Sequence, residues 1–277
     1  MNNTSKLPSL LLAGILTSSL TTQAAVVARY DATGLSAGAT GAIAAWADSS
    51  GNNYNATSVG DPTVVAGAQN GLAVVNFDGN DYFSIPDTYT IGTAFSVAKY
   101  QLNTDLPTPT TTFNFYDGLF TGAGGAGTEI YWSGTNGSTA LWIETALDRR
   151  YLNGTLSEQG APGSFNLYSG VDDSTQTLAG YRIGGDRTFG AGRAWEGDIA
   201  EIILFDTALS DVDRKGVEVY LDEKWGLGQG LRASFGESNF NTLAATGDFS
   251  SVIPEPGSYA LLAGLTGLVF VMLRHRR

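Results

Sequence analysis

Residues 181–227 read YRIGGDRTFGAGRAWEGDIAEIILFDTALSDVDRKGVEVYLDEKWGL. Within them, the runs GYRIGG and DIAEIILF have the apolar content of short β-strands bounded by turn residues. Ser210 is suited to cap a following helix, and Gly226 is suited to end it. The apolar side of this helix is formed by Val217, Tyr220 and Leu221. The stretch therefore predicts strands followed by one helix over residues 210–224 that lies against a β-sandwich.

The rest of the chain, from Ala25 to about Leu231, repeats short apolar or alternating runs separated by turn residues. Asn-Gly pairs occur at 70–71, 136–137 and 153–154, and such pairs suit the positive φ angles of type I′ hairpins. The chain has 36 glycines, 12 tyrosines and 13 phenylalanines but only 2 methionines, which favours strands and tight turns over long helices. We expect one all-β domain over residues 25–231.

The closing block 181–227 and the segments IAAWADSSGNNYNAT (43–57) and LAVVNFDGNDYFSI (72–85) resemble the LamG-like jelly-roll modules of the concanavalin A-like lectin and glucanase superfamily. The match runs from about Arg29 to Leu227, and Gly-Asp-Ile-Ala-Glu, ALS and KWGL follow in order. The resemblance implies a two-sheet antiparallel jelly-roll sandwich with one short C-terminal helix. It does not imply one activity, because members bind glycans, proteins or calcium, and some cleave polysaccharides.

The first 24 residues have the layout of a secretory signal peptide. Lys6 precedes an apolar run, and the small residues Thr22 and Ala24 provide a cleavage site before Ala25 for signal peptidase. The alternative is an N-terminal membrane anchor, but the apolar stretch is short for the roughly 20 residues that a spanning helix needs. We expect export.

The last residues, 253–277, follow a small, polar segment over 232–252 that we expect to be a flexible spacer. Prolines bracket a glutamate, which keeps the chain extended before an uncharged apolar run from Tyr259 to Leu273. That run makes a marginal transmembrane helix. The basic residues after it would stay on the cytoplasmic side. The residues of this pattern are Pro254, Glu255, Pro256, Arg274, Arg276 and Arg277.

This arrangement resembles the PEP-CTERM sorting tail of Gram-negative bacteria. The resemblance implies recognition by an exosortase, removal of the tail, and delivery of an inner-membrane-anchored precursor to the cell surface or an extracellular matrix. Ile253 stands where valine is frequent in the family, and His275 interrupts the arginines. The alternative is a plain C-terminal membrane anchor, which would not need Pro-Glu-Pro.

Composition excludes several functions. The chain has no cysteine, and its one histidine is His275, so Ser-His-Asp, Cys-His and ordinary zinc catalysis are excluded in the folded part. The net charge of −12 repels phosphate backbones, so we expect no nucleic-acid partner. Neutral glycans and cations remain acceptable partners.

Carboxylates are the remaining candidates for catalysis. Glu196, Asp198 and Glu201 superficially resemble the Glu-x-Asp-x-x-Glu motif of laminarinase-type hydrolases. Retaining glycosidases need two carboxyl groups about 5 to 5.5 Å apart, which a bulged strand could supply. Two observations argue against this motif. Gly197 stands where those enzymes place an apolar residue, and strict alternation along a strand puts Glu201 on the opposite face from Glu196 and Asp198. We expect no catalytic residues, with these three as candidates if the protein is a hydrolase.

Oxygen-rich turns suggest calcium as a cofactor. They contain Asp48 with Asn53, and Asp78 with Asp81. Calcium takes six to eight oxygen ligands, so two such turns converging at one rim could bind it. The same residue types are also what ordinary hairpin turns prefer.

Two tryptophans are candidates for contact with a sugar. Trp132 and Trp142 lie on a predicted hairpin around Asn136-Gly137, and an aromatic face suits the C–H face of a pyranose. The alternative is that both pack in the core. The sequence as a whole indicates an exported, non-enzymatic protein that binds extracellular polysaccharide. A carboxylate-dependent glycoside hydrolase and a protein-binding adhesive module remain alternatives.

Overall fold

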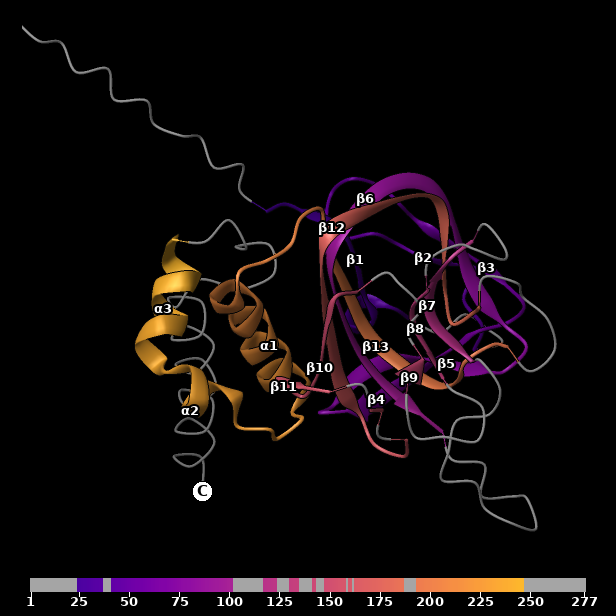
Figure 1. The fold of residues 1–277 in the computed structure, drawn as a ribbon. Helices are drawn as coiled ribbons and strands as arrows, with labels where there is room; N and C mark the ends of the chain where they lie inside the picture. The colour runs from indigo at the N-terminus through magenta and orange to yellow at the C-terminus, as the bar shows by residue number, and fades with distance from the viewer. Residues whose placement is uncertain are drawn as a thin grey trace, which may run out of the picture.

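The computed structural model describes residues 24–36, 41–101, 117–123, 130–134, 141–142, 147–157, 159–160, 162–186 and 193–246 (Figure 1). The strands are β1 (Val26–Asp31), β2 (Ala45–Trp46), β3 (Ala56–Val59), β4 (Thr63–Gln69), β5 (Leu72–Asp78), β6 (Tyr82–Tyr100), β7 (Gly118–Gly122), β8 (Ile130–Gly134), β9 (Leu141–Trp142), β10 (Arg149–Leu152), β11 (Thr155–Leu156), β12 (Asn166–Ile183) and β13 (Glu196–Phe205). The helices are the 3-10 turn η1 (Ala32–Gly34), α1 (Asp211–Trp225), α2 (Leu231–Phe235) and α3 (Glu237–Thr246).

The strands pair antiparallel throughout the described residues and form one hydrogen-bonded network. The central order is β4-β5-β13-β6-β12-β7-β8-β9, and β1 adds to β13. The long strands β6 and β12 pair along most of their length, with register shifts between Val171 and Gln176 and between Ala179 and Tyr181. The prediction of a mostly antiparallel β fold is confirmed.

Two apolar cores lie on opposite faces of β13. Ile199, Ile202 and Leu204 pack in a core among the strands, whereas Ala200 and Ile203 pack in a core that includes the buried side chains of α1. The helices accordingly lie on one side of the strands (Figure 1). A bulge between Ile199 and Glu201 interrupts the alternation, and its effect on Glu201 is described below.

The structure contains two of the predicted turns and both predicted ends of the helix. Asn70-Gly71 and Asn153-Gly154 form turns with φ angles of 49° and 75°, and of 51° and 78°. The third pair, at 136–137, lies outside the described residues, although β8 and β9 on either side of it do pair. The hydroxyl of Ser210 accepts from the backbone N–H of Asp213, and Gly226 adopts the left-handed conformation that ends α1. The predicted helix is therefore confirmed.

The segment after α1 differs from the sequence-based expectation. One helix and a polar spacer from residue 232 were predicted, but α2 and α3 follow α1 and continue to residue 246. Phe235 and Phe240 are buried in the core shared with α1. Burial of these two phenylalanines stabilises α2 and α3 against α1, which the mostly small and polar composition of the segment did not indicate.

The predicted signal peptide, over residues 1–24, and the predicted sorting tail, over residues 253–277, lie outside the described residues except for Ala24. Among the helices that the structure does describe, none has the length and apolar character needed to cross a bilayer.

Candidate ligand-binding pocket

Glu201, one of the three candidate carboxylates, lies in a buried ionic cluster. Its side chain is fully buried, and its carboxylate accepts from Arg29 Nε at 2.8 Å, Lys224 Nζ at 2.6 Å and Trp225 Nε1 at 2.8 Å. The bulge beside Glu201 turns its side chain toward α1. The expectation from strict alternation, that Glu201 lies on the opposite face of the strand from Glu196 and Asp198, is therefore wrong, because the bulge interrupts the alternation.

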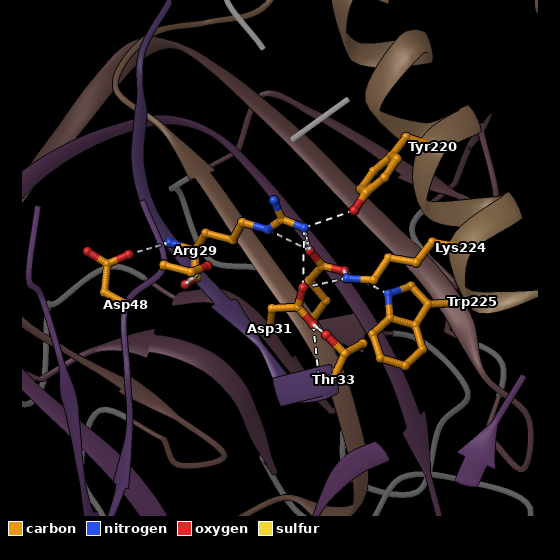
Figure 2. Close-up of polar contacts among 9 residues, drawn as sticks. Arg29, Asp31, Thr33, Asp48, Tyr220, Lys224 and Trp225 are labelled. Atoms are coloured by element: carbon orange, nitrogen blue, oxygen red, sulfur yellow. Dashed lines mark hydrogen bonds and ion pairs between the residues drawn. The ribbon is translucent and has the colours of Figure 1, made fainter. Parts of the chain in front are cut away.

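Neighbouring side chains complete this Glu201 cluster, which comprises Glu201, Arg29, Asp31, Tyr220, Lys224 and Trp225. Figure 2 shows Tyr220, Lys224 and Trp225 reaching from α1 toward Arg29 and Asp31. Lys224 Nζ donates to Asp31 at 2.6 Å, and Arg29 donates to the Tyr220 hydroxyl at 2.9 Å. Burial opposes ionisation of Asp31, but Lys224 and Thr33 outweigh it and lower the pKa of Asp31. The cluster joins α1 to the sheet.

The other two predicted carboxylates have different surroundings. Asp198 accepts from Asn76 Nδ2 at 2.8 Å and from Lys99 Nζ at 3.0 Å, so both of its oxygens are bonded. Glu196 pairs with Asp78 across the β13–β5 ladder, and burial, then Asp78, raises the pKa of Glu196. Each of the three carboxylates therefore has its own set of neighbours.

In the first turn proposed for calcium, the Asp48 carboxylate organises its own loop. One oxygen accepts from the backbone N–H groups of Arg29 at 2.9 Å and Ser50 at 2.8 Å. The other accepts from the Ser50 hydroxyl at 2.8 Å and the Tyr54 N–H at 3.1 Å. Asn53 adopts a φ of 63°, which serves the turn. Four hydrogen bonds thus already satisfy Asp48.

The second proposed turn lies between β5 and β6. Asp78 accepts from the Asn80 N–H at 3.0 Å, and Asp81 accepts from the Asp78 N–H at 3.3 Å. Burial, followed by the charge of Asp78, raises the pKa of Asp81 to about 7. Within the described ranges, no three His, Cys, Asp or Glu side chains are placed to hold a metal ion. Calcium binding stays a prediction.

The candidate aromatic residues occupy the two short strands expected for them. Trp132 lies on β8 and pairs with Phe120, and Trp142 lies on β9 and pairs with Ser133. The backbone of the predicted hairpin is therefore confirmed, and contact of either tryptophan with a glycan stays a prediction.

A pocket that the sequence did not indicate lies where the β10–β11 turn meets α1 and α2. Its volume is about 310 Å³, at the lower end of the roughly 300–1,000 Å³ typical of small-molecule sites. Its lining combines apolar, hydroxyl and charged side chains with one glycine. The residues are Asn153, Gly154, Thr155, Lys215, Glu218, Val219, Leu231, Ser234 and Phe235.

Glu218 is the buried charged group of this pocket, with 1% of its surface exposed. Its Oε1 accepts from the hydroxyl of Ser169 on β12 and from the guanidinium of Arg214, one turn earlier in α1. The Arg214 guanidinium lies 3.6 Å from the ring centroid of Tyr151 on β10. Burial raises the pKa of Glu218, while Arg214 and Ser169 act in the opposite direction. These contacts fix the position of the carboxylate.

The second oxygen of Glu218 faces the pocket. Among the described residues, nothing donates a hydrogen bond to Oε2. Gly154 leaves space there, because a Cβ on it would lie 3.6 Å from Oε2 and 2.9 Å from Leu231 Cδ2. The same glycine has a φ of 78°, as the turn requires. A buried acceptor is thus left available to a ligand that carries a hydrogen-bond donor.

Sequence reasoning missed this pocket because its walls come from three distant segments. One signal was available: Arg214 and Glu218 are four residues apart in a helix, which places them side by side. Both residues lie next to the predicted apolar side of α1, where charged side chains are seldom buried unless they pair with each other.

Neither a protein-family model nor a curated protein sequence matches the chain. Among solved structures, domain 4 of AbnA, a GH43 extracellular arabinanase from Geobacillus stearothermophilus in complex with arabinotriose, is similar at 17% identity and a TM-score of 0.38, over 68% of this chain and 96% of that one. A Trypanosoma rangeli sialidase in complex with sialic acid is similar at 13% identity and a TM-score of 0.45, over 71% of this chain and 33% of the sialidase. This chain therefore spans about one third of the sialidase.

Proposed function

We propose that this chain is an exported, exosortase-sorted surface or matrix protein whose sandwich binds extracellular carbohydrate without cleaving it. The observation that carries the binding proposal is the pocket in which Oε2 of buried Glu218 has no donor among the described residues. Sugars offer several hydroxyl donors and an apolar C–H face. Thr155 on β11 adds a hydroxyl-bearing side chain to the pocket lining, and Leu231 and Phe235 supply apolar surface.

Export and sorting are supported by the sequence patterns of the two ends. The signal-like residues 1–24 and the Pro254-Glu255-Pro256 tail would place the sandwich outside the inner membrane, where it could meet extracellular polysaccharide. Exosortase and signal peptidase are the processing partners in this proposal.

The non-catalytic part of the proposal is supported by the surroundings of the motif carboxylates. Glu201 is enclosed by three donors, and both oxygens of Asp198 accept hydrogen bonds, which favours structural roles for these two carboxylates over contact with a glycosidic bond. A hydrolase reading would be favoured instead if the protein released reducing ends from a polysaccharide and Glu196→Gln abolished that release.

The binding proposal is tested by screening the purified chain against a panel of soluble polysaccharides and oligosaccharides, with calcium and with chelator. Glu218→Gln is expected to weaken binding about tenfold or more, because the ligand loses a hydrogen bond to a charged acceptor. Glu218→Gln also weakens the ion pair with Arg214 and could disturb the fold. Thr155→Val is therefore a second variant, because Thr155 lines the pocket but is exposed. Thr57→Val is the matched control, because Thr57 is an exposed residue of β3 and does not line the pocket. Binding that is absent, or unchanged in both pocket variants, would refute the proposal.

A further inference from the structure

The charges around the pocket are unequal. Glu218 is balanced by Arg214, which is bonded to it and is itself 2% exposed. Lys215 also lines the pocket but is exposed, and among the described residues no carboxylate forms an ion pair with it. Arg214 also pairs with exposed Asp211 at 3.7 Å, so Lys215 is the cation of the pocket lining that forms no ion pair within the described residues. The net charge of −12 repels a polyanion at long range, so the inference concerns one acidic unit held at contact distance by Lys215.

We propose that the pocket takes an acidic sugar unit, a hexuronate, from an acidic polysaccharide. In this arrangement the sugar carboxylate pairs with Lys215 Nζ, a ring hydroxyl donates to Oε2 of Glu218, and the C–H face of the ring lies against Leu231 and Phe235. The inference rests on the proposed function, because it identifies the class of carbohydrate that the same site binds.

Other ligand classes fit this set of groups less well. An organic cation could pair with Oε2 of Glu218 but would approach the Lys215 ammonium, and Arg214 already neutralises that carboxylate. A neutral sugar could make the hydroxyl and apolar contacts but would leave the Lys215 charge unused. A hexuronate uses the acceptor, the cation and the apolar wall together.

The expected preference is modest, because Lys215 is exposed and water screens its charge. Exposed ion pairs contribute at most about fivefold to an affinity, and they weaken further in salt. We therefore expect the acidic ligand to bind about threefold to fivefold more tightly than its neutral counterpart at low salt, with the difference lost at high salt.

The test is calorimetric titration of the purified full chain with trigalacturonate and with neutral galactotriose, at roughly 20 mM and 500 mM salt. The chain should prefer trigalacturonate at low salt only. Lys215→Gln should abolish the preference by bringing the affinity for trigalacturonate down to that for galactotriose, and Lys215→Arg should retain the preference. Thr155→Val should weaken both ligands equally.

The outcomes separate the two proposals. Equal affinity for the two ligands, or a preference that survives Lys215→Gln, would overturn the hexuronate inference and leave carbohydrate binding standing. Binding of neither trigalacturonate nor galactotriose by a folded chain would overturn the inference, whereas binding of other glycans in the wider screen would still support the proposed function.

Discussion

Glu201 of β13 and Lys224 of α1 form an ion pair of 2.6 Å across the interface between the sheet and the helix. Glu201 is also bonded to Arg29 and Trp225, so one carboxylate joins the first described strand, the last strand and the first α-helix. A group with three donors and no exposed side-chain surface has a structural role here, although its sequence motif resembled a catalytic one.

The Glu201→Gln variant should therefore lower stability sharply. Removing the charge leaves Arg29 and Lys224 partly unbalanced in a buried site, and breaking such pairs costs about 3–5 kcal/mol. Urea unfolding followed by tryptophan fluorescence measures the change. Glu237→Gln, in an exposed pair with Arg232, is the control and should cost about 1 kcal/mol or less. Equal costs for the two variants would contradict the structural role.

Phe240 tests whether α3 belongs to the folded domain. Its side chain is 1% exposed and packs in the core shared with α1, so Phe240→Ala should cost about 3–5 kcal/mol in unfolding free energy. Ser238→Ala, on the exposed side of the same helix, should change the unfolding free energy by roughly 0.5 kcal/mol or less. A flexible spacer over these residues would instead give two equally small effects.

Asp81 should make stability depend on pH. Burial and Asp78 raise its pKa to about 7 from a usual 3.8, so between these values the folded protein holds a proton that the unfolded chain has released. The unfolding free energy should consequently decrease as pH rises through this window. The Asp81→Asn variant lacks this contribution. The unfolding free energy of the variant minus that of the parent should therefore increase from about pH 4 to about pH 7 and stay constant above pH 7. Denaturant unfolding at several pH values measures this, and a pH-independent difference would contradict it.

The proposed sorting tail leads to a prediction that can be tested in cells. Replacing Pro254 and Pro256 by alanine should leave export intact but block removal of the tail, because the recognition segment would lose its extended form. Mass spectrometry of the membrane fraction should show accumulation of the uncut precursor. Normal maturation of this variant would count against exosortase processing.

Much of the fold could be predicted because its signals are local. Asn70-Gly71 and Asn153-Gly154 need positive φ angles wherever they occur, and Ser210 with Gly226 delimits α1 by capping alone. Each of these turns and caps is determined by residues that are close together in sequence, so its conformation depends little on tertiary packing.

The remainder depends on contacts between distant residues. The bulge before Glu201 is stabilised by Arg29, Lys224 and Trp225, none of which is near it in sequence. The pocket likewise appears only when the β10–β11 turn, α1 and α2 meet around Glu218. In α3, a single buried phenylalanine outweighed a polar composition typical of a linker.

The place of β13 in the sheet has a consequence for folding. It lies between β5 and β6 and also pairs with β1, so Arg29 meets Glu201 across 172 positions of sequence. Such non-local pairing gives a high contact order and slow folding. The middle of the sheet is completed last, and a nascent chain that stops before about residue 205 leaves β5 and β6 with open edges that invite aggregation.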